Sequence, residues 1–211
     1  MNTATPGFPS NSPRFGARHA LFALIGLATL FVIYHNERFI VDHTDPQWKY
    51  YLPVMVPLVP HGLAGAVALF LGASQFSTRL RQRHARLHRV MGRCYVIGVA
   101  IAAPMAIYLT LHHNALASQV AIITTALSWL LTTGVAFQAI RQRDFLRHQQ
   151  WMMRSYAVTL VFLLDRVLDA FPALAALDTD DSPNMIWICN VVAWMAPTLI
   201  IAWRRGEAAT R

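Results

Sequence analysis

The sequence predicts an all-α integral membrane bundle of six transmembrane helices, with both termini in the cytoplasm. Three observations lead to this fold class: an apolar composition, six long apolar segments, and arginines that gather in alternate connections. Hydrophobic residues make up 55% of the 211 residues and charged residues only 13%. A soluble domain carries about 25% charged residues, so this composition excludes an ordinary soluble protein.

Six apolar segments are long enough to be transmembrane helices, because crossing a bilayer takes roughly 20 mostly apolar residues. They span residues 19–35, 52–76, 89–111, 118–140, 151–171 and 184–203. They lack the alternating polarity of barrel strands, and only helices or closed barrels satisfy their own backbone groups in lipid. We therefore expect a membrane domain over 19–205. Residues 1–18, rich in Pro, Ser, Asn and Gly, are expected to form a disordered cytoplasmic tail, and residues 206–211 a second tail.

The distribution of arginine predicts the orientation. Arginines precede the first segment and fill the connections after the second, fourth and sixth; they are Arg14, Arg18, Arg79, Arg81, Arg83, Arg86, Arg89, Arg141, Arg143, Arg147, Arg204, Arg205 and Arg211. The other connections hold only Arg38 and Lys49. Cytoplasmic loops of membrane proteins are rich in Lys and Arg, so both termini are expected in the cytoplasm. The net charge of +8 is then explained by the arginines of the cytoplasmic connections. The expected partner is the lipid bilayer, and nucleic-acid binding is not expected.

The segment 52–76 carries a face of small and polar residues. His61, Gly65, Ala68, Gly72 and Gln75 share this face at spacings of three and four residues. Small residues let a second helix, or a flat cofactor, approach the backbone closely. His61 has two interpretations, which both stay open: a histidine bonded to a neighbouring helix, or a functional ionisable group within a span.

Three charged residues, Asp165, Arg166 and Asp169, lie in the outer third of the segment 151–171. Charges at such a depth are costly and usually pair within the bundle. Arg166 and Asp169 stand at positions i and i+3, which permits a local ion pair. One interpretation is such a pair at the outer interface. The other is a partner for an anionic group, such as a haem propionate, or for His61.

Two histidines are expected at one cytoplasmic depth. His88 stands at the start of the third segment, and His148 precedes the fifth. Two neutral imidazoles on facing helices can ligate a haem iron axially, which predicts one b-type haem with these two residues as metal ligands. The arginines expected to bind its propionates are Arg89, Arg93 and Arg154. The alternative for His88 is an interfacial histidine that contacts lipid phosphate.

These side chains belong to longer motifs, of which the most specific is the stretch AIRQRDFLRHQQWMMRSYA. The residues that carry a resemblance are His61, Gly65, Gly72, Gln75, Phe76, Arg79, His88, Arg89, Gly92, Arg93, Tyr95, Asp144, His148, Trp151, Met152, Arg154, Ser155, Tyr156, Arg166, Trp194 and Pro197. Over about residues 52–205 the chain resembles a bacterial predicted membrane protein family, domain of unknown function twenty-three-oh-six. Thr198 stands where this family pattern leads us to expect asparagine. The resemblance implies a multi-helix membrane protein and no established activity.

The placement of histidines on the third and fifth helices also resembles that in cytochrome b561-type bundles. The fourth-helix histidine of that pattern is missing here, which favours one haem over two. The leading hypothesis is therefore a multi-pass inner-membrane redox protein that binds one haem and exchanges electrons with quinol or a membrane redox partner. Two alternatives remain: a small-molecule or proton-linked transporter with His61, Asp165 and Arg166 along its path, or a non-enzymatic subunit of a membrane complex. No catalytic residue is assigned, because common catalytic motifs such as H-E-x-x-H, the P-loop and G-x-S-x-G are absent.

Overall fold

The structure is a computed structural model that describes residues 15–179 and 182–209. Its helices, in chain order, are α1 Phe15–His35, η1 Arg38–Ile40, α2 Pro46–Tyr51, η2 Leu52–Val54, α3 Met55–Ser74, α4 Thr78–Arg83, α5 Ala85–His113, α6 Leu116–Arg141, α7 Phe145–Asp169, α8 Pro172–Ala175 and α9 Asn184–Ala209. Here η1 and η2 are short 3-10 helices. Apart from an isolated bridge between Thr179 and Ser182, every regular element in the described ranges is helical.

Each predicted apolar segment corresponds to one long helix, but the ends differ. Helix α1 begins at Phe15, so residues 15–18 of the predicted tail are helical, and the rest of that tail lies outside the described residues. Helix α9 continues to Ala209, so most of the predicted tail 206–211 is also helical, with 210–211 outside the description. These ends were missed because polar residues continue a helix beyond its apolar part.

Helix α7 shows the local reason for such an early start. It begins at Phe145, where the sequence predicts a start at residue 151. The Asp144 carboxylate accepts a hydrogen bond of 3.0 Å from the backbone N–H of Arg147. A side chain that satisfies a free N–H of the first turn stabilises the helix start. The polar residues that follow, His148 among them, are therefore helical rather than part of a loop.

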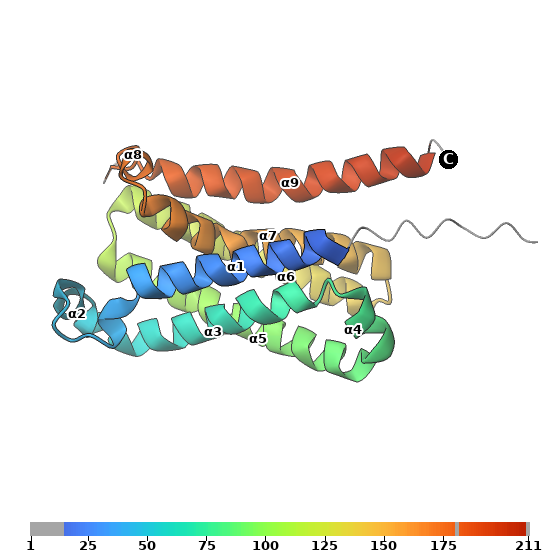
Figure 1. Cartoon of the computed structure of the whole chain (residues 1–211), viewed down its shortest axis with the longest axis horizontal. Coiled ribbons are helices and arrows are strands. Elements are labelled where there is room, and N and C mark those ends of the chain that lie inside the picture. Colours follow the sequence, from blue (N-terminus) through green and yellow to red (C-terminus); the bar gives the residue numbers. More distant parts are fainter. Residues whose placement is uncertain (1–14, 180–181, 210–211) are drawn as a thin grey trace, which may run out of the picture.

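The long helices run side by side along the long axis of the molecule (Figure 1). Helices α3, α5, α6 and α7 form a ring, since α3 packs on α5, α5 on α6, α6 on α7 and α7 again on α3. Helices α1 and α9 lie outside this ring and both pack against α7. These four helices thus form a four-helix bundle, and side chains on facing helices of such a bundle can build a site in its interior.

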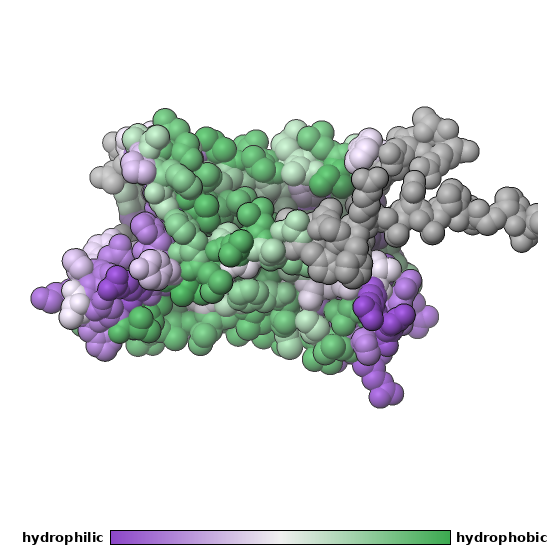
Figure 2. Space-filling model, viewed as in Figure 1, coloured by the Kyte–Doolittle hydropathy of each residue, from purple (hydrophilic) through white to green (hydrophobic). Residues whose placement is uncertain are grey.

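Four helical stretches are long and apolar enough to cross a membrane: Pro46–Ser74, Ala85–His112, Leu116–Arg141 and Asn184–Trp203. The corresponding stretch of α1, Phe22–His35, is shorter, and α7 carries charges along its length. Figure 2 shows apolar side chains over the middle of the visible face and hydrophilic ones at both ends. The described residues thus give a helical bundle with four candidate spans, and the count of six spans stays a prediction.

The arginine-rich connections lie at one end of the bundle. Helix α4 and the connection between α6 and α7 are there, and α1 begins and α9 ends at the same end (Figure 1). We call this the basic end. The opposite end, called the loop end, carries α2 and α8. Which end faces the cytoplasm stays a prediction from the charge distribution.

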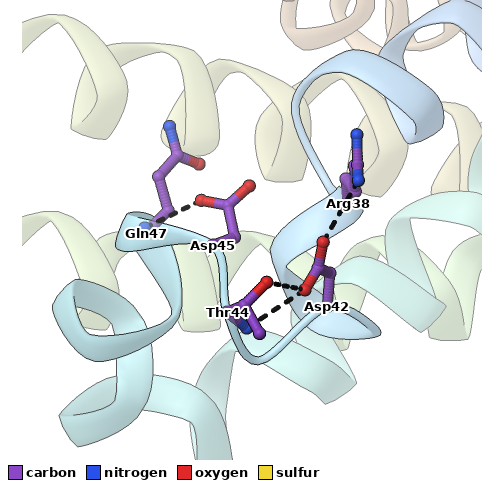
Figure 3. Close-up of polar contacts among 5 residues, drawn as sticks. All are labelled: Arg38, Asp42, Thr44, Asp45 and Gln47. Carbon is purple, nitrogen blue, oxygen red and sulfur yellow. Dashed lines mark hydrogen bonds and ion pairs between the residues drawn. The ribbon is translucent and has the colours of Figure 1, made fainter.

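A compact turn orders the connection between α1 and α3 at the loop end (Figure 3). The Asp42 carboxylate accepts hydrogen bonds from the backbone N–H of Thr44 at 3.0 Å and from its hydroxyl at 2.5 Å. Arg38 donates to the other carboxylate oxygen at 3.2 Å. Asp45 then accepts from the backbone N–H of Gln47 at 2.9 Å and caps α2. Aspartate is favoured in both places because its short side chain reaches nearby backbone groups.

Close approach between α3 and α5 occurs on the predicted small-residue face at Ala68 and Gly72 but not at Gly65. It also involves Gly98 of α5, which was not predicted. A Cβ added at Gly98 of α5 would lie 2.8 Å from the Ala64 carbonyl oxygen of α3. A Cβ at Gly72 of α3 would lie 2.6 Å from the Tyr156 ring and 2.8 Å from the Tyr95 ring. At Gly65 nothing lies within 4 Å of an added Cβ. The close contact of the two helices therefore depends on Gly98, and Gly72 makes room for the tyrosine rings.

Gly98→Ala should destabilise the bundle by about 1–3 kcal/mol, the usual cost of an overpacked site. The added methyl group meets a backbone carbonyl, which cannot rotate away. Gly65→Ala is the matched control, because its methyl group meets nothing and alanine favours a helix by up to about 1 kcal/mol. Thermal unfolding of both purified variants in detergent measures the difference, and equal midpoints would contradict this contact.

The Asp42 turn predicts a dependence on pH. The hydrogen bonds from the Thr44 hydroxyl and backbone N–H, with a smaller contribution from Arg38, lower the pKa of the Asp42 carboxyl. A lowered pKa means that the turn is stabilised above the ordinary pKa of aspartate and loses this stabilisation as the pH falls through the folded-state value. Thr44→Ala should raise the pKa of Asp42, and Arg38→Ala should raise it less. Titration of the carboxyl signal by NMR measures both shifts; a larger shift in Arg38→Ala would refute the assignment.

Candidate functional site

A buried set of polar side chains joins α5, α6 and α7 inside the ring. The Tyr95 hydroxyl is 2.6 Å from Ser155 Oγ and 3.0 Å from Thr159 Oγ1. Trp129 Nε1 donates to the same Tyr95 oxygen at 3.4 Å, and Thr133 Oγ1 is 2.7 Å from Ser155 Oγ. We call these five residues the hydroxyl cluster. All five are buried, and Tyr95 and Ser155 are fully inaccessible.

The hydroxyl cluster sets the register of α5 against α7. His88 precedes Tyr95 by seven residues on α5, and His148 precedes Ser155 by seven residues on α7. Both helices start at the basic end, and seven residues are close to two helical turns, or roughly 10 Å along the axis. Because Tyr95 and Ser155 touch, the two histidines lie at matched depth on facing sides of the ring. They are close enough to interact electrostatically.

His148 is oriented by a backbone hydrogen bond. Its Nδ1 lies 2.8 Å from the carbonyl oxygen of Ala136 on α6. A carbonyl oxygen only accepts, so Nδ1 carries the hydrogen and the lone pair is on Nε2. Histidines that ligate metals usually have this arrangement, with one ring nitrogen held by a carbonyl and the other directed at the metal.

His88 and Gln75 each hold a buried polar atom without a partner among the described residues. They are the Nδ1 of His88 and the Nε2 of Gln75. Gln75 ends α3 and reaches α5 next to Gly92, where an added Cβ would be 3.2 Å from Gln75 Oε1. Gly92 is one turn from His88. Buried polar atoms normally have partners, so two unpartnered atoms mark this corner; among the described residues, Asn36, Thr110 and Asn190 hold other such atoms elsewhere.

His61 belongs to the opposite part of the bundle. Its Nδ1 lies 2.9 Å from the carbonyl oxygen of Ala102 on α5, and its ring meets the edge of Phe162 on α7. The bond to a neighbouring helix is therefore present. Ala102 is fourteen residues beyond His88 on the same helix, or roughly 21 Å away. His61 thus does not share a site with His88 and His148.

The charged group near the end of α7 forms a loose ion pair. Arg166 Nη1 is 3.9 Å from Asp169 Oδ2, with side chains that are 49% and 43% exposed. Asp165 is partly buried. Glu37 lies within the electrostatic reach of Arg166; partial burial raises the pKa of the Glu37 carboxyl, and Arg166 opposes that rise. Exposed pairs of this kind contribute little to stability.

The arginines predicted to hold propionates differ in their surroundings. Arg89 and Arg93 are exposed on α5, and Arg89 is close enough to His88 to act on it electrostatically. The Arg154 guanidinium lies 5.1 Å from the centre of the Trp151 ring, and its Nη1 donates to the Gln150 carbonyl at 3.4 Å. In the described parts of the chain no three His, Cys, Asp or Glu residues group as metal ligands.

Part of this site was visible in the sequence and part was not. The seven-residue spacings from His88 and His148 place Tyr95 and Ser155 on the inward faces of their helices. Trp129 and Thr133 have no comparable signal, because the polar residues of α6 are spread around the helix and form no single polar face. Other threonines of α6, such as Thr125 and Thr132, bond to carbonyls of their own helix, so sequence position does not distinguish Thr133 from them.

Ser155→Ala should lower the free energy of unfolding by about 1–3 kcal/mol, because it removes hydrogen bonds to Tyr95 and Thr133 and leaves buried hydroxyls with fewer partners. Thr124→Ala is the matched control, since the Thr124 hydroxyl is exposed and bonds to the Val120 carbonyl of its own helix. Denaturant unfolding followed by circular dichroism compares the two. If both variants were equally stable, the hydroxyl cluster would not be the central contact between these helices.

Comparison with known proteins gives one match. The model of the family DUF2306, described as a predicted membrane protein, matches residues 58–204. No curated protein and no solved structure matches the chain. The matched range covers most of the 211 residues and includes the hydroxyl cluster, His61, His88 and His148. The chain therefore belongs to the DUF2306 family of predicted membrane proteins.

Proposed function

We propose that this protein is a membrane redox protein that binds one b-type haem through His88 and His148. One observation carries the proposal: these two imidazoles lie at matched depth on facing helices of the ring, and the Nδ1 of His88 is one of the buried polar atoms without a partner among the described residues. Cofactor sites in helical bundles are built from side chains on facing helices. Two histidines are also a sufficient axial ligand set for haem iron.

The donor atoms present fit this group. The hydrogen bond from Nδ1 to the Ala136 carbonyl leaves the His148 Nε2 lone pair available. The Nδ1 of His88 has no partner, and the described structure shows no hydrogen bond to the His88 ring. This ring is therefore free to act as a ligand. Gly92 presents no side chain one turn away, and Gln75 fills the adjoining space. A flexible glutamine is a side chain that can move aside for a ligand.

Each group of the chain has a separate role in this proposal. The Ala136 carbonyl holds the His148 ring in one orientation and makes it a better donor. The hydroxyl cluster closes the site toward the middle of the bundle and excludes water there. The exposed guanidinium groups of Arg89 and Arg93 would bind the carboxylates at the rim, and Arg154 would join them by leaving the Gln150 carbonyl. When bound, the haem supplies a one-electron iron couple.

The location and partners in this proposal follow from charge and depth. The arginines at the basic end favour a cytoplasmic position for that end and for both termini. Family membership supports a multi-pass membrane protein, and we assign it to the bacterial inner membrane. The electron partner would be a quinol or a membrane protein that reaches the site from the lipid or from the basic end.

The transporter alternative has less support. It requires His61, Asp165 and Arg166 to line one polar path. His61 is instead bonded to the Ala102 carbonyl, and Arg166 pairs loosely with Asp169 at an exposed position. The remaining alternative, a non-enzymatic subunit, predicts a purified protein without a cofactor.

The absorption spectrum of the full chain, expressed with an ample haem supply and purified in detergent, tests the proposal. We expect a Soret band and one haem per chain in the pyridine haemochrome assay. His88→Ala and His148→Ala should each lose most of the haem, because one axial ligand is removed. His84→Ala is the matched control: this exposed histidine is one turn away on the same arginine-rich stretch, and its haem content should equal that of the wild type.

Two results would overturn the proposal. One is a wild-type protein without a Soret band under these conditions. The other is full haem content in His88→Ala or in His148→Ala. Circular dichroism of each variant identifies a failure to fold, and a folded variant without haem supports the assignment.

A further inference from the structure

The surface at the basic end contains a hollow that shares only Arg89 with the haem proposal. It has a volume of about 500 Å³ and lies at the turn between α4 and α5. Its lining residues are Arg83, His84, Ala85, Arg86, Leu87 and Arg89. Three of these six residues are arginines, so the segment that lines the hollow is positively charged.

Among the described residues, no acidic side chain forms an ion pair with these arginines. The sequence holds no Asp or Glu from residue 46 to residue 143. Among the described residues, the two ion pairs of the structure, Arg38 with Asp42 and Arg166 with Asp169, are elsewhere. Guanidinium groups bind phosphate oxygens through paired N–H donors. The chemistry of the hollow therefore selects a phosphate-bearing ligand.

An apolar stripe leads away from the hollow along α5. Leu87, Val90, Ile97 and Ile101 follow one another at helical spacing, with Cys94 between them, and these four residues have relative exposures of 43–57%. Residues at such spacing form one face of a helix. This face lies on the outside of the ring, where an acyl chain would lie. A soluble phosphate would use the arginines alone and would leave this stripe without a role.

We infer that the hollow binds the phosphate of an anionic phospholipid, with one acyl chain along the stripe of α5. Basic pockets next to membrane helices bind anionic headgroups in this way, and each arginine near an anionic surface strengthens the attraction. The bound lipid anchors the turn between α4 and α5 at the level of the headgroups. This inference does not rest on the haem proposal, because Arg83 and Arg86 are not among the groups assigned to haem.

Native mass spectrometry of the full chain in neutral detergent, titrated with dioleoyl phosphatidylglycerol, tests the inference. Wild-type protein should retain this lipid in preference to dioleoyl phosphatidylcholine. The double variant Arg83→Gln/Arg86→Gln should bind phosphatidylglycerol about 25-fold more weakly, or about fivefold for each arginine. Arg143→Gln/Arg147→Gln is the matched control: it changes the charge equally at exposed positions of the other basic connection and should bind within about twofold of the wild type.

Several outcomes would overturn the inference. They are equal retention of the two lipids by the wild type, unchanged phosphatidylglycerol binding in Arg83→Gln/Arg86→Gln, or an equal loss in the control variant. Glycerol phosphate, which carries the phosphate without acyl chains, is the third ligand of the titration. It should compete only at concentrations far above those of the lipid. Competition at equal concentration would assign the hollow to a soluble phosphate and refute the lipid.

Discussion

The hydrogen bond between Tyr95 and Ser155 is the contact on which the arrangement of the ring depends. Apolar contacts alone give membrane helices no hydrophobic driving force to associate, because lipid chains are as apolar as leucine. A buried hydroxyl pair at 2.6 Å, in contrast, forms at one relative height of the two helices only. Thr133, Thr159 and Trp129 extend this contact to α6 and along α7. The depth at which every other residue of α5 and α7 meets its neighbour follows from this register.

The position of Tyr95 is in turn determined by glycine. Its ring and that of Tyr156 occupy the space that a side chain at Gly72 would fill. The Tyr156 hydroxyl donates to the Leu69 carbonyl of α3 at 3.2 Å, so α3 also joins the register of α5 and α7. Because Gly72 has no side chain, the two tyrosine rings fit against α3, and the Tyr156 hydroxyl reaches its backbone. Gly98 brings α3 and α5 together nearer the loop end. The distance between these two helices is therefore determined at two positions along their length, Gly72 and Gly98.

The sequence predicted the long helices well and the hydroxyl cluster only in part. Long apolar segments identify helices because hydropathy is a property of composition, whereas the start of α7 depends on one capping carboxylate at Asp144. His88 and His148 were singled out because they stand at the same end of the third and fifth apolar segments, and their role as ligands stays a prediction. Thr133 was not, because whether a threonine bonds to its own helix, as Thr125 does, or to a neighbour is decided by packing. The partner of His61, the Ala102 carbonyl, is a backbone atom and has no sequence signal at all.

The first turns of α5 face both the surface of the molecule and the interior of the ring, and helical geometry separates the residues of the two faces. Arg86 and Val90 lie on the outer face, four residues apart, in line with the exposed Ile97. His88 and Tyr95 lie on the inner face, in line with the buried Val99. Arg86 and His88 are two residues apart, and residues at that spacing point in nearly opposite directions on a helix. A dense run of arginines and histidines is therefore compatible with one site inside the ring and another on its surface. The positive charge of this end does not have to enter the bundle.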